Sequence, residues 1–226
     1  MKIGVLGTGV VGQTIAGRLA ELGHEVVIGT RDVAALLART EPDRMGNSPF
    51  AVWSSAHPAV RVATFAEAAG HGDLVVNATS GTASLPALRA AGADNLAGKV
   101  ILDIANPLDF SKGFPPSLFV KDTDSLAEQI QRELPQSRVV KSLNTMNAGL
   151  MVRPETLADA DHAVFVSGDD EAAKAQVVEL LRGFGWRDII DLGGLSSARA
   201  AEMVLPLWLH VMGRLGTSRF NFKVVR

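Results

Sequence analysis

The residues best suited to chemistry form a glycine-rich turn near the start of the chain. Gly7, Gly9 and Gly12 have the spacing GxGxxG, between the apolar stretch 2–6 and a stretch with helical periodicity. In such a turn the first glycine permits a tight bend, the second lets backbone approach a pyrophosphate, and the third allows close helix-on-strand packing. The amides that begin the helix lack intrahelical partners and lie at the positive end of its dipole. The pattern predicts a dinucleotide site.

A second informative position is the end of the next predicted strand, at Thr30, Arg31 and Asp32. An acid there hydrogen-bonds the ribose hydroxyls of NAD, whereas a basic residue accommodates the ribose phosphate of NADP. The Arg31 guanidinium presents donors in a fixed fork and the Thr30 hydroxyl adds another, so the pair favours NADP. Two alternatives stay open: a strand that ends one residue later places Asp32 at the ribose, or Asp32 caps the next helix and Arg31 is a solvated charge.

Small polar residues follow several later strands. They are Asn77, Ala78, Thr79 and Ser80, then Asn106 and Pro107, then Asn144, Thr145, Met146 and Asn147. Ligands of open parallel sheets bind outside the carboxyl ends of the strands, so these segments should meet at one site, with 77–80 on the cofactor. Few of the groups titrate near neutral pH, and no serine lies beside an obvious histidine base. Hydride transfer between two stacked rings is favoured over hydrolysis, and no catalytic residue is identified.

Two further charged features lie near predicted strand ends. Lys141 is a candidate general acid or substrate anchor, although a lysine in such a place usually reaches solvent. The segment 168–171, Gly-Asp-Asp-Glu, suits a metal by composition. Acids are also favoured by the dipole at a helix start, and we favour that interpretation.

Strand and helix patterns alternate along the chain, which predicts an α/β fold with a doubly wound parallel sheet. The expected strands are 2–6, 24–28, 61–63, 73–78, 99–104, 138–143, 162–166 and 188–191. The expected helices are 13–22, 33–39, 65–69, 85–91, one capped by 123–125 that runs to 133, 171–184 and 197–214. The stretches 41–58 and 108–120 are predicted to be loops on the substrate side.

The composition fits this fold and excludes several functions. The chain has 226 residues, 47% of them hydrophobic, and a formal charge of −2 without a basic stripe, so no nucleic-acid partner is expected. Cysteine is absent, which removes disulfides and thiolate catalysis. No metal is expected, because no HxxxH pair occurs among His24, His57, His71, His162 and His210. Nothing resembles a signal peptide or a membrane span, and we expect a soluble, cytoplasmic protein.

Four blocks of the sequence resemble the NADPH-dependent deazaflavin coenzyme (F-420) reductases. They are GTGVVGQTIAGRLAELGHEVVIGTRD, RVVKSLNTMNA, VFVSGDDEAAKAQVVELL and DLGGLSSARAAEMVLPLWLHVMGRLG. The resemblance covers most of the chain in the same order. It implies a Rossmann domain over 1–145, a small C-terminal α/β extension over 146–226, and hydride exchange between NADP(H) and a deazaflavin (F-420-type) or flavin-like acceptor.

The same resemblance assigns residues to each ligand. It implies that Thr8, Val10 and Val11 contact the NADP cofactor beside the three glycines. It places the substrate ring at Asn144, Thr145, Met146 and Asn147 under the C-terminal tail, with Asn106 and Pro107 on the same side.

The last predicted helix is apolar around much of its circumference, through Leu205, Leu207, Trp208, Leu209, Val211, Met212 and Leu215. Such a helix is buried in the core or against a second subunit, and we favour a homodimer. Pro206 predicts a kink or a fresh helix start, and His210 is expected to be packed or interfacial. In the alternative, Trp208 and Met212 form a wall for a flat ring, although such a stripe is more often core.

Two other functions stay open at this point. One is NADPH-dependent reduction of another small acceptor, such as a ferric chelate, imine or carbonyl, the last two of which need a proton donor such as Lys141 or a polar loop residue. The other is a non-catalytic NADP sensor. The fold does not decide between them, because function lies in the site.

Overall fold

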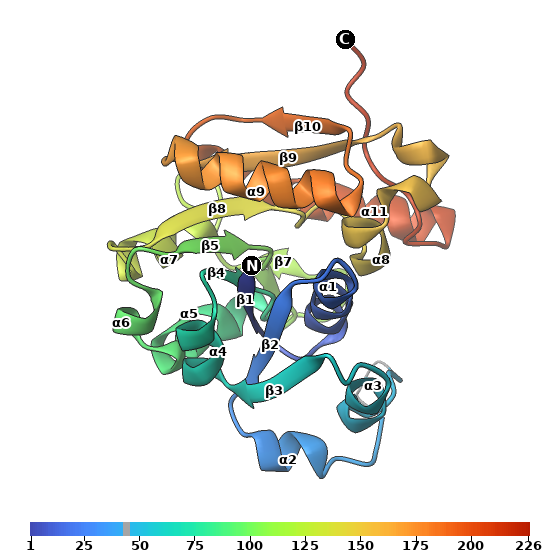
Figure 1. Ribbon diagram of the computed structural model, residues 1–226. Helices are drawn as coiled ribbons and strands as arrows, with labels where there is room; N and C mark the ends of the chain where they lie inside the picture. Colours follow the sequence, from blue (N-terminus) through green and yellow to red (C-terminus); the bar gives the residue numbers. More distant parts are fainter. Residues whose placement is uncertain (43–45) are drawn as a thin grey trace.

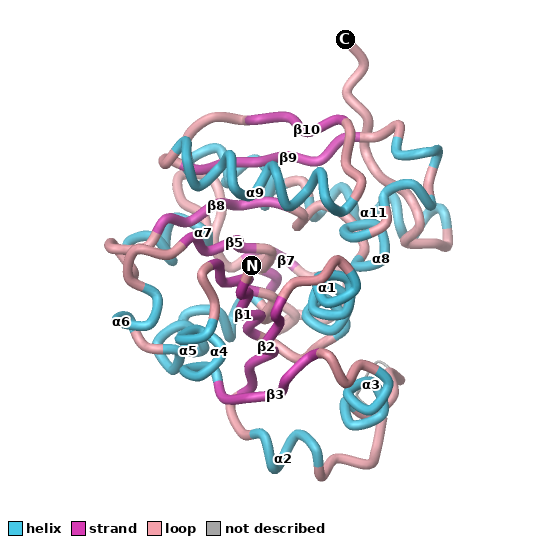
Figure 2. Tube along the Cα trace, in the orientation of Figure 1, coloured by secondary structure: helices cyan, strands magenta, loops and turns pink. Residues whose placement is uncertain are grey.

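Strands and helices alternate along the chain in the computed structural model, which describes residues 1–42 and 46–226 (Figures 1 and 2). One eight-stranded sheet has the order β10-β9-β8-β5-β4-β1-β2-β3. Its strands are β1 (Lys2–Leu6), β2 (Glu25–Thr30), β3 (Val60–Thr64), β4 (Leu74–Asn77), β5 (Val100–Asp103), β8 (Arg138–Ser142), β9 (Ala163–Gly168) and β10 (Asp188–Asp191). A separate antiparallel hairpin joins β6 (Leu108–Asp109) to β7 (Ser117–Leu118).

Helices cover both faces of the sheet. One core cluster joins the strands to α1 (Val10–Glu21), α3 (Phe50–Ala56), α8 (Ala148–Val152) and α9 (Glu171–Phe184). The other joins them to α4 (Phe65–His71), α5 (Gly81–Ala91), α6 (Ala93–Leu96), α7 (Leu126–Glu133) and α10 (Ala198–Met203). The remaining elements are α2 (Val33–Leu37), α11 (Leu205–Leu215) and the 3-10 turns η1 (Pro154–Thr156), η2 (Ala158–Ala160) and η3 (Leu195–Ser197).

The central strands are apolar because both of their faces are buried. In β2, Val26 and Ile28 belong to the core under α1, whereas Val27 belongs to the core under α4. In β4, Val75 likewise faces away from its neighbours Leu74 and Val76. Strands covered on both sides lose the polar alternation of a half-exposed sheet. This explains why they are recognisable as short apolar runs.

The order of the strands defines where a ligand would bind. From β1 the chain continues to β2 and β3 on one side of the sheet, and β4 and β5 then pair on the other side. The crevice between β1 and β4, at their carboxyl ends, is therefore the switch point of the topology. It begins at Gly7 and Ala78, the residues that follow these two strands.

The fold class is confirmed, with one correction to the sheet. All pairings from β3 to β8 are parallel, but β9 runs antiparallel to β8, with Val140 opposite Gly168. After β8 the chain passes through α8 and two short turns and enters β9 near the carboxyl end of β8. An antiparallel strand can start there without a crossover helix. Single-strand periodicity carries no information on this direction. Both β9 and β10 extend the same sheet, as Figure 1 shows above β8.

Two predicted loops contain regular structure. The stretch 41–58 includes α3, which begins after Pro49, buries Phe50, and stacks Trp53 on His57 with ring centroids 4.4 Å apart. Residues 43–45, including Met45, lie outside the described residues. The stretch 108–120 contains the β6–β7 hairpin. Both elements are too short for a clear hydrophobic period.

The C-terminal helical segment divides as Pro206 predicts. The chain leaves α10 at Val204 and starts α11 with this proline in its first turn. Trp208 and Leu209 are buried, and Trp208 stacks on Phe220 of the C-terminal tail with centroids 5.1 Å apart. The expectation of a packed His210 is wrong within this chain, because the residue is exposed. Within the described ranges, no helix has the length and apolar character needed to cross a membrane.

Candidate functional site

The glycine turn has the geometry that its spacing predicts. Gly7 has φ +112°, and a Cβ there would lie 2.7 Å from the Ala78 carbonyl oxygen. A Cβ on Gly12 would lie 1.9 Å from the Gly7 oxygen, so α1 can approach the turn only without a side chain there. At Gly9, by contrast, a Cβ would meet no atom of the described residues within 4 Å. The space above Gly9 is therefore open to a ligand.

The start of α1 is suited to an anion. Gly9 is the N-cap residue, no side chain caps the helix, and its first turn contains no acid. Gln13 Nε2 donates a hydrogen bond to the Thr8 carbonyl at 2.8 Å, which fixes the conformation of the turn. The first amides of this twelve-residue helix point outward with their partial positive charge.

A cleft of about 510 Å³, here called the phosphate cleft, joins the turn to the end of β2. Its wall includes most of the cofactor residues predicted from the sequence: Gly7, Thr8, Gly9, Thr30, Arg31, Ala78, Thr79 and Ser80. Arg39, which sequence reasoning missed, lines it as well. Neither Arg31 nor Arg39 forms an ion pair with any residue that the structure describes. Asp32 lines the same cleft, but neither arginine pairs with it, and two cations without an ion-pair partner among the described residues fit a phosphate group.

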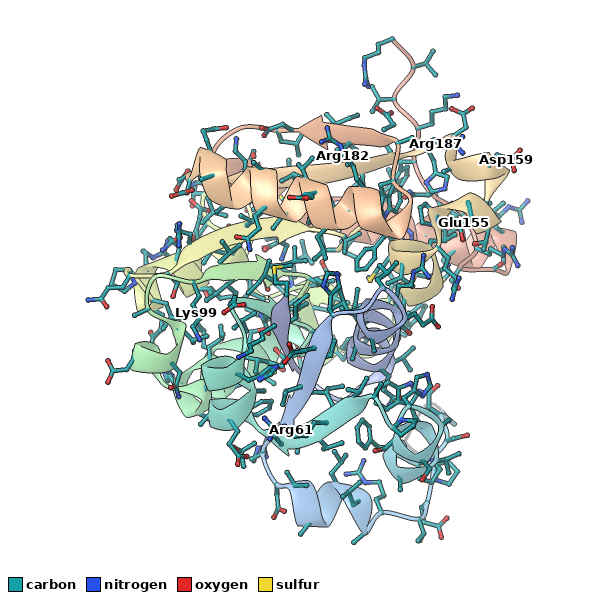
Figure 3. All side chains as sticks on the ribbon, viewed as in Figure 1. Arg61, Lys99, Glu155, Asp159, Arg182 and Arg187 are labelled. Atoms are coloured by element: carbon teal, nitrogen blue, oxygen red, sulfur yellow. The ribbon has the colours of Figure 1, made fainter. Side chains whose placement is uncertain are left out.

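Asp32 caps the helix that follows β2. The strand β2 ends at Thr30, and Asp32 is the N-cap of α2, with Oδ1 accepting a hydrogen bond from the Ala35 amide at 2.9 Å. The predicted cap is confirmed, but Asp32 also lines the phosphate cleft and Arg31 is exposed, so the choice between the two ribose groups stays a prediction. Other cations lie elsewhere: Figure 3 shows Arg61 on β3 and Arg182 and Arg187 beside α9 and β10.

A second cleft, of about 380 Å³ and here called the ring cleft, adjoins the first along Ala78, Thr79 and Ser80. Its other lining residues are mainly apolar: Val11, Gly81, Thr82, Ile104, Ala105, Asn106, Leu108, Phe110, Met146 and Met151. Gly81 lets α5 begin directly against this wall, because a Cβ there would lie 2.1 Å from the Asn106 oxygen. An apolar slot with a few polar groups fits a flat ring such as a nicotinamide.

Asn77 lies behind the wall rather than in it. Its side chain is fully buried, and its Nδ2 donates to Ser84 Oγ at 3.2 Å and to Asp103 Oδ1 at 2.7 Å. Its Oδ1 accepts from the Thr79 hydroxyl at 2.7 Å. Asn77 thus orients Thr79, while exposed Ser80, whose hydroxyl makes no capping bond, faces the clefts.

The predicted substrate residues divide into two groups. Asn106 and Met146 line the ring cleft, whereas Pro107, Asn144 and Thr145 are buried beside it. The Asn144 carboxamide donates to Asn106 Oδ1 at 2.9 Å and to the Ala201 carbonyl at 3.0 Å. These buried groups support the wall.

Asn147 lines a third cleft, of about 530 Å³, here called the C-terminal cleft. Its other lining residues are Val10, Ala148, Gly149, Leu150, Arg153, Thr156, Ser218 and Arg219. Asn147 Nδ2 donates to the Ser218 carbonyl at 2.5 Å, which fastens the tail to the start of α8. The predicted substrate loop and the C-terminal tail therefore meet at one cleft.

Lys141 does not reach solvent, contrary to the sequence expectation. Its side chain is 0% exposed, and Nζ lies 2.8 Å from Asp103 Oδ2 and 2.9 Å from Glu202 Oε1. Burial alone would lower the pKa of Lys141, but the charges of these two carboxylates outweigh it and raise the pKa above its usual value. Burial raises the pKa of Glu202, against the opposing effect of Lys141. The ammonium is enclosed and its three hydrogens face protein oxygens, so it is poorly placed to donate a proton to a carbonyl or imine substrate.

The acidic segment 168–171 is a helix start, as expected. Asp170 is the N-cap of α9, with its carboxylate accepting from the Ala173 amide at 2.7 Å. Asp169 Oδ1 accepts from the Leu195 amide at 2.7 Å. No group of three or more metal-ligating side chains occurs within residues 1–42 and 46–226.

Comparison with known proteins places this site in a family. The sequence profile described as NADP oxidoreductase coenzyme F420-dependent matches residues 2–107. A solved structure from Arthrobacter sp. FB24, provisionally assigned as an F420-dependent NADP-reductase, is 60% identical, with a TM-score of 0.96 and 100% of both chains covered. The chain belongs to the coenzyme F420-dependent NADP oxidoreductase family.

Curated relatives extend the family comparison. The F420-dependent NADP reductase of Methanothermobacter marburgensis is 29% identical over 215 residues, which cover 93% of this chain and 92% of the relative. The metalloreductase STEAP3 of Rattus norvegicus is 29% identical over 212 residues. The matched part is 92% of this chain but 38% of the rat protein's length.

Proposed function

We propose that this family member transfers a hydride between NADP(H) and coenzyme F420. The observation that carries the proposal is the continuity of two unlike clefts. The phosphate cleft, with Arg31 and Arg39, shares the wall 78–80 with the apolar ring cleft. A ligand with a phosphorylated ribose at one end and a flat ring at the other fits this pair.

The residues present fit NADP at each part of the site. Thr30, Arg31 and Arg39 would hold the ribose phosphate, and the first amides of α1 would hold the pyrophosphate above Gly9. The wall 78–80 and Met146 would orient the nicotinamide. When bound, NADPH supplies a hydride to the acceptor ring, which also takes up one proton from water. The protein contributes orientation and exclusion of water, because none of the described residues that line the ring cleft has an ionisable side chain.

We place the acceptor on the side formed by residues after 145. Phe110 of the hairpin is 58% exposed and lines the ring cleft, where it offers an aromatic face to a second flat ring. Arg219 and Arg153, the latter paired with Glu21 at 2.6 Å, edge the C-terminal cleft and favour an acceptor that carries negative charge. In this proposal residues 1–145 supply most of the NADP site, and residues 146–226, together with Phe110, complete the acceptor site.

The same proposal includes a homodimer. Three apolar side chains of α10 and α11 face solvent, with 38% of Met203, 56% of Leu207 and 57% of Leu215 exposed. A second copy related by a two-fold axis would cover such a face. Sedimentation should give twice the chain mass for the native protein and the monomer mass for Leu207→Glu. A native monomer would contradict this assembly.

The activity is tested by mixing purified protein with NADPH and oxidised coenzyme F420, with NADH, flavin mononucleotide and a ferric chelate as comparisons. The proposal expects F420 reduction that depends on NADPH, with NADH much less effective. NADPH binding without turnover of any acceptor would indicate a sensor instead. Turnover of flavin or ferric chelate alone would move the function to another acceptor.

A further inference from the structure

The buried Lys141 ammonium contacts the wall of the ring cleft in addition to the carboxylates of Asp103 and Glu202. An ammonium has three donors, and Nζ is also hydrogen-bonded to the Ala105 carbonyl, so three oxygens surround it. Ala105 is held a second time, because its amide donates to Asp103 Oδ1 at 3.3 Å. Ala105 and the adjoining Asn106 line the ring cleft. The position of Ala105 and Asn106 in the wall therefore depends on the Lys141 ammonium, which is buried and does not line the cleft itself.

The cluster draws on segments far apart in the sequence. Asp103 ends β5 and Lys141 lies on the neighbouring β8. Glu202 comes from α10, and its two oxygens accept hydrogen bonds from the amides of Leu126 at 2.8 Å and Ala127 at 3.2 Å, at the start of α7. The ammonium thus joins two strands and two helices at the nicotinamide end of the site.

The hydrogen bonds of the cluster leave little room for another arrangement. Asp103 Oδ1 also accepts from Asn77 Nδ2 at 2.7 Å, and Asn77 in turn accepts from Thr79, which lines the same cleft. One hydrogen-bond network therefore fixes two wall segments of the ring cleft, the one at Thr79 and the one at Ala105. A buried polar network of this kind is rigid when every member is satisfied.

We propose that Lys141 is a positioning residue for hydride transfer, which holds the Ala105–Asn106 wall in place against the nicotinamide ring. The effect expected on hydride transfer rests on the proposed function. The effect expected on ligand binding requires only that the protein binds NADP. Lys141 does not touch either reactant. Its loss should disturb the nicotinamide end of the site and leave the phosphate end intact.

The test compares two ligands that differ in the nicotinamide. Binding of NADP⁺ and of 2′-phospho-ADP-ribose, which lacks that ring, is measured by calorimetry for the native protein, Lys141→Met and Lys141→Met/Glu202→Gln. The double variant removes one buried carboxylate with the cation and avoids a large uncompensated charge. We expect affinity for the fragment within about 2-fold of native and NADP⁺ affinity lower by roughly 10-fold, with single-turnover hydride transfer slower by about 100-fold, as a displacement near 1 Å can cause.

A matched control is available in Lys174→Met. Lys174 is also buried, at 4% exposed, and pairs with Asp191 and Glu171 at 2.9 Å each, but it lines none of the three clefts. This variant should leave both ligands and the hydride-transfer rate unchanged.

Several results would overturn the inference. They are equal weakening of both ligands, no change in either ligand or rate, and failure of both Lys141 variants to fold, which would make the cluster purely structural. A different pattern would reject the proposed function alone: native protein that prefers NADP⁺ over the fragment, loses this preference without Lys141, and yet reduces no F420.

Discussion

The two ends of the site are built in different ways. At the phosphate end, Gly7, Gly9, Thr30 and Arg31 lie within 24 residues of one another and their polar groups face an open cleft. At the ring end, the wall depends on Lys141, Asp103 and Glu202, which are buried and come from separate elements. In our proposal the first end is a local motif that contacts the ligand directly, whereas the second is a long-range framework that shapes a slot.

This difference explains what the sequence could predict. The turn geometry follows from glycine spacing, and the strand-to-helix junction at Arg31 follows from a local pattern, so both were accessible. Lys141 was expected to reach solvent because its partners lie 38 positions before it and 61 after it, beyond any local pattern. Asn77 and Asn144 were recognised as polar groups at strand ends, but only the folded arrangement shows that they face inward.

The fold shows the same division. The boundaries of α9 and β10 coincide with the predicted ones because each is an unbroken periodic run. The antiparallel direction of β9 depends on how the chain returns to the sheet, which periodicity does not encode. The missed helix α3 is short, and its stability derives from tertiary burial of Phe50.

The largest effect is expected at the ring end, where substitution of Lys141 should lower the stability of the fold. Lys141→Met should lower the free energy of unfolding by about 3 to 5 kcal/mol, because it leaves two carboxylates buried without their cation. Urea unfolding followed by circular dichroism measures this loss. Glu202→Gln added to the variant should recover part of it, and a loss below about 1 kcal/mol would remove the framework role.

A substitution at the phosphate end should lower the affinity for NADPH rather than the stability of the fold. Arg31→Ala should weaken NADPH binding by about 2 to 3 kcal/mol, roughly 30- to 150-fold, with little effect on NADH, because a charge-assisted pair with the phosphate is lost. Fluorescence titration with both nucleotides measures the ratio. Arg61→Ala is the control, since this exposed arginine on β3 lines none of the clefts described above (Figure 3). Equal loss for both nucleotides would remove Arg31 from the phosphate site.

The hairpin tests whether the ring end also selects the acceptor. Phe110→Ala should raise the KM for the acceptor by roughly 5- to 10-fold, since aromatic stacking contributes about 1 kcal/mol, and should leave NADPH affinity unchanged. Phe114→Ala is the matched variant, because Phe114 is 67% exposed and lines none of the clefts described above. Similar acceptor kinetics in both variants would argue against stacking on Phe110.

The smallest effect concerns an exposed charge pair beside the buried cluster. The pKa of Asp124, just before α7, is lowered from 3.8 to about 2, chiefly by the hydrogen bond from Arg132 and further by hydrogen bonds from Gln129 and the Ser125 amide. Because the folded pKa is depressed, the stabilisation is present above about pH 4 and is lost as the pH falls towards 2. Arg132→Ala should remove most of it, less than about 1 kcal/mol after solvent screening. Urea unfolding at about pH 5 and about pH 3 tests this, and a loss as large as that of Lys141→Met would show that the surface pair, too, holds α7.

The most direct test of the separation between the two ends is single-turnover hydride transfer from NADPH to F420 in Arg31→Ala, measured over a wide range of NADPH concentrations. The account predicts that the concentration needed for half-saturation rises at least 30-fold, while the rate constant at saturation stays within about 3-fold of native. A rate constant that falls in parallel with the affinity would contradict the account, because the phosphate end would then also position the reacting rings.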